Sequence, residues 1–297
     1  MAYKFHTCDV FSEARFGGNP LAVFPNAEGL TTEQMQLIAR EFNLSETTFV
    51  FPGTQDFTRK VRIFTPAQEV PFAGHPNVGT AFTLAKLGEL GQVDGQVEVV
   101  FDEKAGPVPI TIRKNGNKIW CELKAPTELT IGETIPVTQI ATAIGLKPEQ
   151  IVTSTHPPQV ASVGLGFVTV ELIDREALTN ASALFPIFQE IQQAGVHPYV
   201  FMYVRSDDEF DIRARMFAPT DNIMEDPATG SATCAMVALL THCKVESDGE
   251  FSFRVGQGIE MGRPSLLEAR SQKENGVVTG VWVGGTCVSM TSGTIEL

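Results

Sequence analysis

Two related stretches decide the fold of this chain: RIFTP at residues 62–66 and RMFAP at residues 215–219. The first leads into His75-Pro76 and the second into Asp226-Pro227, and an uncharged segment follows each pair. Self-similarity of this kind indicates a structural duplication. We therefore expect two similar halves that present a histidine and an aspartate at equivalent positions, beside the starts of two buried helices. A ligand site is expected in the cleft where the halves face one another.

Length and net charge limit the number of domains and the kinds of partner that we expect. A chain of 297 residues exceeds one usual compact core, so two domains of about 100 to 150 residues are expected. The net charge of −13 opposes binding to a phosphate backbone, which depends on clustered Lys and Arg. We expect no nucleic-acid partner and no membrane partner. The start of the chain, MAYKFH, lacks the apolar core of a signal peptide, which predicts a cytoplasmic location.

The residues that bind cofactors in other proteins do not form their usual patterns here. The 5 cysteines are scattered without a Cys-x-x-Cys pair, which favours reduced, buried thiols over disulfides or zinc ligands. No group of acids or histidines has the spacing of metal ligands. The GLG at residues 164–166 lacks the third glycine of a dinucleotide site. The sequence therefore predicts neither a metal nor an organic cofactor.

Local patterns predict an α+β fold. Thr31 and Gln34 form a capping box for a helix that should end near Asn43, and TTFVF at residues 47–51 is typical of a strand. Asn-Gly pairs at 115–116 and 275–276 each separate two β-rich runs and predict hairpins. Each half is then a curved, mostly antiparallel sheet wrapped on a central helix. Residues 125–136 are the expected linker, which divides the chain into domains 1–125 and 126–284.

The two uncharged segments, residues 77–85 and 228–243, predict helices that protein encloses on all sides. A proline precedes each at a plausible first helical position, with His75 or Asp226 as the cap. The exposed N–H groups of the first turns, with the helix dipole, are a natural seat for a carboxylate. The hydroxyl of Ser231 adds to this seat. Glycines keep side-chain bulk away from the helix starts: Gly74, Gly79 and Gly230.

Glu46 is the acid that we expect to move protons. It lies between Leu44 and Phe49, and partial burial would raise its pKa toward a range useful for taking and giving a proton. Alternatively, Glu46 is a solvated turn residue or caps a neighbouring helix. His75 is a proton donor, an orienting group or a buried helix cap. Asp226 before a proline is also compatible with a cap alone.

Several separate motifs together resemble the phenazine-biosynthesis isomerase (PhzF) family. They are NLSETTFV (43–50), RIFTP (62–66), PFAGHP (71–76) and EDPATGSA (225–232), with GNP at 18–20 and GTIEL at 293–297. The resemblance implies a fold similar to diaminopimelate epimerase, with two related domains and a last strand, about 285–297, that returns to the first. It also implies a homodimer and a cofactor-free shift of a proton between carbons of a small carboxylate. Glu46, His75 and Asp226 would be catalytic, and four residues would bind substrate: Ser45, Gly74, Gly230 and Ser231.

The chain departs from the epimerase in one informative way. The two catalytic cysteines of that enzyme have no counterparts in the loops at Ala73-Gly74-His75 and Asp226-Pro227-Ala228, and Cys234 lies about one turn into its helix. A two-thiol racemisation is disfavoured. An epimerase or racemase that uses acid/base residues stays open, and so does a small-molecule binding protein on the same scaffold. A dihydroanthranilate-like substrate is implied by the resemblance only.

Overall fold

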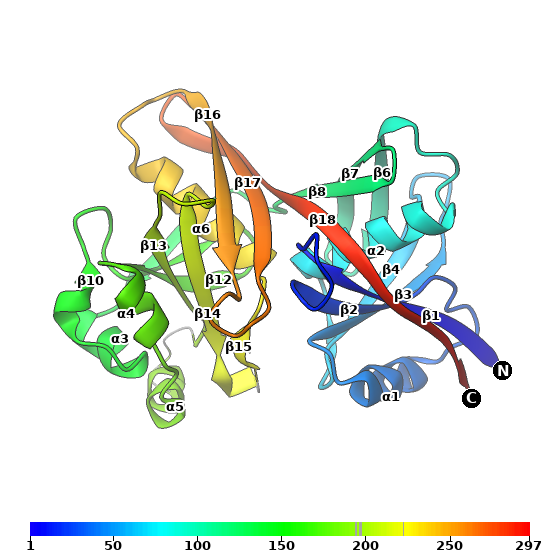
Figure 1. Ribbon diagram of the computed structural model, residues 1–297, viewed down its shortest axis with the longest axis horizontal. Coiled ribbons are helices and arrows are strands. Elements are labelled where there is room, and N and C mark those ends of the chain that lie inside the picture. Colours follow the sequence, from blue (N-terminus) through cyan, green and yellow to red (C-terminus); the bar gives the residue numbers. More distant parts are fainter. Residues whose placement is uncertain (194, 196–197, 222) are drawn as a thin grey trace. The chain divides into compact units, whose positions relative to one another are not determined.

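The computed structural model describes residues 1–193, 195, 198–221 and 223–297. The chain divides into two compact units: unit 1 comprises Met1–Lys124 and Gly284–Leu297, and unit 2 comprises Ala125–Val283. Both units combine helices with a dominant sheet, which agrees with the expected mixture of α and β structure (Figure 1). Among the described residues, no helix is long and apolar enough to cross a membrane.

Unit 1 is a sheet of strands with one enclosed helix and one outer helix. The helices are α1 (Thr32–Phe42) and α2 (Gly74–Leu87). The strands are β1 (Ala2–Val10), β2 (Asn19–Phe24), β3 (Glu46–Pro52), β4 (Arg59–Phe64), β5 (Glu69–Val70), β6 (Gly95–Glu103), β7 (Gly106–Asn115), β8 (Lys118–Lys124) and the later part of β18 (Val277–Glu296).

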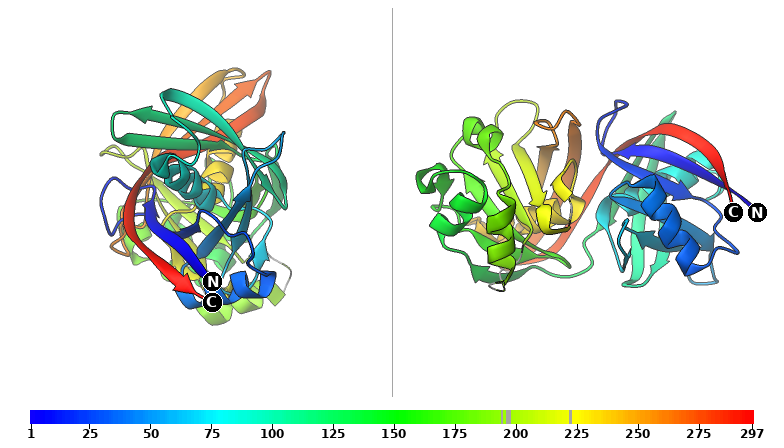
Figure 2. Two further views of the ribbon diagram at one scale, coloured as in Figure 1. Left: turned by 90° about the vertical axis from the view of Figure 1, so that its right-hand side faces the viewer. Right: turned by 90° about the horizontal axis from the view of Figure 1, so that it is seen from below.

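The order of pairing in unit 1 mixes parallel and antiparallel neighbours. Strand β1 pairs antiparallel with both β2 and β18, so the two ends of the chain lie side by side, as Figures 1 and 2 show. Strand β2 pairs parallel with β3, β3 antiparallel with β4, and β4 parallel with β6. Strands β6, β7 and β8 continue antiparallel. Parallel neighbours require crossover connections, and α1 and α2 lie in those crossovers.

Helix α2 is the centre of unit 1. Its residues 74–85 are all buried, and it contacts β1, β2, β3, β7 and β8. The absence of charged side chains from residues 74–85 is explained by their burial, and the charged Lys86 lies in the exposed last turn. At Gly79 a Cβ atom would lie 2.6 Å from the side chains of both Val10 and Leu21, so only glycine permits this close approach. The Thr80 hydroxyl lies 2.8 Å from that of Thr48 on β3.

The predicted local elements of unit 1 are confirmed. Thr31 and Gln34 form both hydrogen bonds of the capping box, and Asn43 ends α1 in the left-handed conformation. The apolar face of α1 packs into a cluster in which the rings of Phe24 and Phe49 stack at 5.0 Å. The Asn-Gly pair at 115–116 joins β7 to β8, with Asn115 opposite Lys118.

Unit 2 has more helices and a similar sheet. The helices are α3 (Val137–Ala143), η1 (Pro148–Gln150), α4 (Arg175–Asn180), α5 (Phe185–Gln193), η2 (Pro219–Asp221) and α6 (Gly230–Cys243), of which η1 and η2 are 3-10 turns. The strands are β9 (Thr130–Thr134), β10 (Ile151–Val152), β11 (Gln159–Ser162), β12 (Gly166–Leu172), β13 (Val200–Arg205), β14 (Ile212–Ala218), β15 (Ile223–Asp226), β16 (Gly249–Gln257), β17 (Ser265–Glu274) and the first residues of β18.

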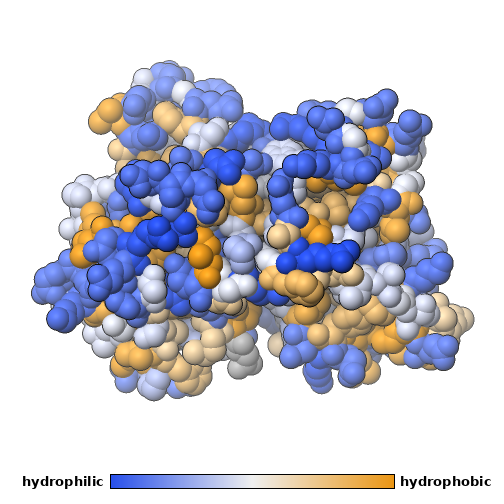
Figure 3. All heavy atoms as spheres, in the orientation of Figure 1, coloured by the Kyte–Doolittle hydropathy of each residue, from blue (hydrophilic) through white to orange (hydrophobic). Residues whose placement is uncertain are grey.

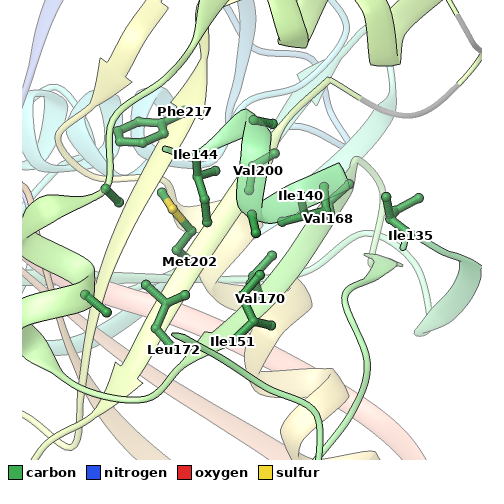
Figure 4. Packing of buried hydrophobic residues seen from close by; sticks show 14 of the residues in the cluster. Ile135, Ile140, Ile144, Ile151, Val168, Val170, Leu172, Val200, Met202 and Phe217 are labelled. Carbon is green, nitrogen blue, oxygen red and sulfur yellow. The ribbon is translucent and has the colours of Figure 1, made fainter. Parts of the chain in front are cut away.

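Helix α6 is the buried helix of unit 2 and contacts β11, β12, β16 and β17. Strand β12 pairs parallel with β13, β13 antiparallel with β14, and β14 parallel with β16. Apolar residues of α3, α4, α5 and the neighbouring strands form a core, in which the side chains of Ile144, Val200, Met202 and Phe217 converge (Figure 4). In the face drawn in Figure 3, hydrophilic residues cover much of the surface.

The two quoted stretches have the same structural role. In β4, Arg62 forms two hydrogen bonds of 2.8 Å with Glu69 of β5. In β14, Arg215 forms two hydrogen bonds of 2.8 Å with Glu225 of β15. Each guanidinium also lies over a phenylalanine ring two residues further on, at 5.1 Å from Phe64 and 4.9 Å from Phe217. The repeated arginine therefore holds a hairpin in each unit.

The expected linker was wrong in part. Within residues 125–136 the chain forms β9, which pairs antiparallel with β11. All five residues of β9 are exposed. A strand without a buried face shows no alternation of apolar and polar residues, so the pattern that predicts strands was missing.

Candidate functional site

In unit 1 the structure brings Glu46 and His75 together. Glu46 is the first residue of β3, and His75 is the second residue of α2. Strand β3 packs on α2, which places His75 Nε2 3.5 Å from Glu46 Oε2. Both side chains are largely buried, with exposed fractions of 16% for Glu46 and 6% for His75. An acid and an imidazole in this arrangement are suited to hold one proton between them.

Burial sets the charge of His75. Desolvation lowers the pKa of His75 to about 3, so the imidazole is neutral at physiological pH. A neutral imidazole carries one N–H and one acceptor nitrogen. His75 is therefore a neutral polar neighbour of Glu46 and not its permanent counter-ion.

Ser45 and Gly74 flank this pair. The Ser45 hydroxyl donates to Asn19 Oδ1 at 2.9 Å, and Asn19 is fully buried at the start of β2. The parallel pairing of β2 with β3 brings these residues together. Asn19 was noted only as part of a family motif, and its buried amide was not foreseen. Gly74 is the first residue of α2. The N-cap residue before it is Ala73, whose methyl side chain makes no capping hydrogen bond to the helix.

In unit 2 a second group gathers at the start of α6. Asp226 is the last residue of β15 and is 6% exposed. It accepts a hydrogen bond from the Thr229 hydroxyl. Gly230 and Ser231 are the first two residues of α6. As far as the structure is described, the hydroxyl of the N-cap residue Thr229 does not cap the helix, because it is directed back to Asp226.

The expected caps were wrong. The N-cap residues are Ala73 and Thr229, and neither His75 nor Asp226 takes that position. Pro76 is the third residue of α2, where the missing N–H is tolerated because the first-turn N–H groups have no partner within the helix.

The expected equivalence of His75 and Asp226 was also wrong. By position in its helix, His75 corresponds to Ser231, since each is the second residue. Asp226 ends β15 as Val70 ends β5. The turn η2 and a longer β15 lengthen the connection in unit 2, which shifts the acid relative to the helix.

Glu103, which the sequence reasoning missed, is a further buried acid of unit 1. It ends β6 and is 7% exposed. Desolvation raises the pKa of Glu103 to about 8, against the opposing effect of the nearby Asn77 amide. Asn77 donates to the carbonyl of Ala73, just before the start of α2. Glu103 shares a strand face with buried Val99 and Phe101, so the alternation of β6 was a signal for its burial.

The possible metal ligands and the cysteines are two further sets of reactive side chains. In the described ranges, no group of three or more His, Cys, Asp or Glu side chains is arranged to hold a metal ion. Four cysteines are buried, and burial raises the pKa of Cys8 to about 12. Cys243 is the exposed one. The buried thiols stay protonated and are poor nucleophiles.

Comparisons with known proteins agree on one family. A family model described as "Phenazine biosynthesis-like protein" (PhzC-PhzF) matches residues 8–293. A trans-2,3-dihydro-3-hydroxyanthranilate isomerase of Pseudomonas aeruginosa is 33% identical over 292 residues, covering 98% of each chain. A protein of Mesorhizobium japonicum named as an uncharacterized isomerase is 37% identical and covers 96% of each chain.

Solved structures agree on the fold. A PhzF-family protein of Bacillus anthracis has a TM-score of 0.88 at 24% identity, and each chain is covered completely. A hydroxyproline epimerase of Agrobacterium vitis has a TM-score of 0.67 at 14% identity, covering 99% of this chain and 91% of its own.

Proposed function

Because this chain belongs to the phenazine biosynthesis-like (PhzC-PhzF) family, we propose that it is a cofactor-independent isomerase that moves a proton between two carbons of one small carboxylate-bearing molecule. Relatives of similar length are named as isomerases, which supports the reaction class. The substrate in the names of three of them, trans-2,3-dihydro-3-hydroxyanthranilate, is the first compound to test.

The contact between Glu46 and His75 is the observation that carries this proposal. Glu46 as a carboxylate removes a proton from one carbon, and the electron pair of the broken C–H bond is delocalised into the substrate. Protonated Glu46 then returns the proton to another carbon of the same molecule, so no redox partner is required. A neutral imidazole carries one donor and one acceptor nitrogen, so His75 suits a neighbouring acid that is ionised in one step and protonated in the next.

The remaining residues would bind and orient the substrate. The first-turn N–H groups of α2 and α6, which begin at Gly74 and Gly230, favour negative charge. We propose that Gly74 and Ser45 of unit 1, and Gly230 and Ser231 of unit 2, bind the substrate, as the resemblance to the family implies. Asp226, beside the start of α6, is the second acid that acts on the substrate.

We also infer that the two units are pseudo-symmetric copies of one ancestral fold. In both units two parallel strands are followed by an antiparallel strand, a short strand that completes a hairpin and a buried helix. A last strand then pairs parallel with the antiparallel one. The elements are β2, β3, β4, β5, α2 and β6 in unit 1, and β12, β13, β14, β15, α6 and β16 in unit 2. The matching pairs Arg62–Glu69 and Arg215–Glu225 support this relation. A homodimer is part of the same proposal, and sedimentation analysis tests it.

The decisive experiment replaces Glu46 by glutamine. Glu46→Gln keeps the shape of the side chain but cannot carry the proton, so turnover of trans-2,3-dihydro-3-hydroxyanthranilate should fall at least about 1,000-fold while binding persists. Glu190→Gln, at an exposed glutamate of α5, is the control for the chemical change. NMR of the product shows whether unsaturation has moved. Near-normal turnover by Glu46→Gln would contradict the role of Glu46, and inversion of a stereocentre without a shift of unsaturation would indicate an epimerase.

A further inference from the structure

We propose that Gln257 is a positioning residue that, through Thr229, holds Asp226 as an ionised hydrogen-bond acceptor for a hydroxyl or ammonium group of the substrate. The inference rests on the proposed function, in which Asp226 acts on the substrate. It extends that function to residues of β16 that the sequence motifs do not include, and to the chemistry of the substrate group that Asp226 meets.

Gln257 is fully buried and is the last residue of β16. Its Oε1 accepts from the backbone N–H of Thr229 at 2.9 Å. Its Nε2 donates to the backbone carbonyl of Asp226 at 2.8 Å and to Thr229 Oγ1 at 3.0 Å. The side-chain amide of Gln257 therefore hydrogen-bonds to both the first and the last residue of the segment from Asp226 to Thr229.

These contacts leave one arrangement of hydrogens. A backbone N–H only donates and a backbone carbonyl only accepts, so the two backbone contacts fix which end of the Gln257 amide is oxygen. The second hydrogen of the amide then occupies a lone pair of Thr229 Oγ1. The single hydrogen of the Thr229 hydroxyl is left for Asp226 Oδ2, 2.5 Å away. Asp226 Oδ2 must therefore be an acceptor, which favours the carboxylate over the acid.

Residues of β17 and of the turn after β16 also contact the segment, at Pro227. The Ser265 hydroxyl, at the start of β17, donates to the Pro227 carbonyl at 2.9 Å. Gly258 has φ of +73°, and a Cβ atom there would lie 2.6 Å from the same carbonyl. Close backbone approach and buried hydrogen bonds keep Asp226 in one position, as a preorganised binding group requires.

A carboxylate fixed in this way is a poor proton donor. It attracts a hydroxyl or ammonium group, because hydrogen bonds to an ionised acceptor are stronger than neutral ones. Asp226 then contributes binding and electrostatic stabilisation, and the transfer of the proton is left to Glu46. A substrate that carries both a carboxylate and an N–H or O–H donor fits this division of roles.

The test compares three substitutions with wild type. Thr229→Val removes the hydroxyl, Thr229→Ser keeps it, and Gln257→Glu replaces the donating nitrogen by an acceptor. Gln272→Glu on β17, next to Glu274 on the surface, is the matched control for the amide-to-acid change. With trans-2,3-dihydro-3-hydroxyanthranilate, Thr229→Val and Gln257→Glu should raise KM about 10- to 100-fold with a smaller change in kcat, as expected for one lost hydrogen bond to a charged group. Thr229→Ser should restore KM to within about threefold of wild type, allowing for the lost methyl contact.

A second readout needs no substrate. Titration of the Asp226 carboxyl by ¹³C NMR should show ionisation at higher pH in Thr229→Val than in wild type and Thr229→Ser. If Thr229→Val leaves the Asp226 titration unchanged, or if Thr229→Ser behaves like Thr229→Val, the inference is wrong. If wild type does not turn over the compound while the titration shifts as expected, the proposed substrate fails and the positioning role stands.

Discussion

The most informative stability test compares the two repeated arginines. The side chain of Arg215 is 9% exposed, and besides Glu225 it donates to the carbonyls of Leu178 and Ala181, both at 2.8 Å. Removing one partner of such a buried ion pair costs about 3–5 kcal/mol, because it leaves an uncompensated charge. Arg62 is 22% exposed and its partner Glu69 is 20% exposed. Water replaces part of that interaction, so a loss of about 1 kcal/mol is expected.

The assay uses the 2 tryptophans of the chain, Trp120 in unit 1 and Trp282 in unit 2. Arg215→Met is placed in a Trp120→Phe background and Arg62→Met in a Trp282→Phe background, and urea unfolding is followed by fluorescence. Arg215→Met should lower the free energy of unfolding of its unit by at least about 2 kcal/mol more than Arg62→Met does. Equal losses, or a larger loss for Arg62→Met, would refute the argument from burial.

Other predictions concern protons, thiols and metals. Folding lowers the pKa of His75 from 6.5 to about 3, so between these pH values the unfolded chain binds a proton that the folded chain does not. The free energy of unfolding should therefore fall as pH drops from about 6.5 toward 3. His75→Gln should make this fall less steep, which unfolding measured at a series of acid pH values checks. Glu103 should have the opposite effect, because folding raises its pKa from 4.5 to about 8. The free energy of unfolding should fall as pH rises from 4.5 toward 8, since burial disfavours the ionised carboxylate. The stability of Glu103→Gln relative to wild type should therefore be higher at pH 8 than at pH 5. A thiol reagent added to native protein should modify Cys243 before the four buried cysteines, which mass mapping checks. Dialysis against a chelator should leave turnover unchanged; loss on dialysis and recovery with a divalent ion would contradict the metal-free reaction.

Sequence reasoning was strongest where the signal was local. The capping box at Thr31 and the Asn-Gly turn at 115–116 depend on hydrogen bonds and dihedral angles within a few residues, and both are confirmed. The family was identified from motifs that span the chain, and the comparisons confirm it. Strand β9 was not predicted, because it pairs with residues 159–162 of β11, far along the sequence, and because neither of its faces is buried.

The candidate site shows the same division. The motifs indicated Glu46 and His75, but their contact depends on the packing of β3 against α2, which no spacing encodes. The position of Asp226 was misjudged because the equivalence with His75 rested on the proline that follows each residue, whereas Pro76 lies inside α2 and Pro227 lies before α6 begins at Gly230. Gln257 carries no local signal, since its role arises from the parallel pairing of β14 with β16, which places it opposite Ala214 beside the hairpin that ends at Asp226. The roles assigned to the site residues stay predictions for the variants above.

The long strand β18 has a consequence for how the chain is made. Residues 277–283 of this strand belong to unit 2, while its later residues belong to unit 1 and pair with β1 from Ala2 to Val10. During synthesis, unit 2 has its whole sequence once Val283 has left the ribosome, but unit 1 must wait for the final residues although most of it was made first. The edge of β1 that pairs with β18 therefore stays unpaired until residues 287–296 have been made, and an unpaired edge invites association with other chains. Nascent protein should depend on chaperones until residues 287–296 have emerged, and truncation after Val283 should leave unit 1 prone to aggregation.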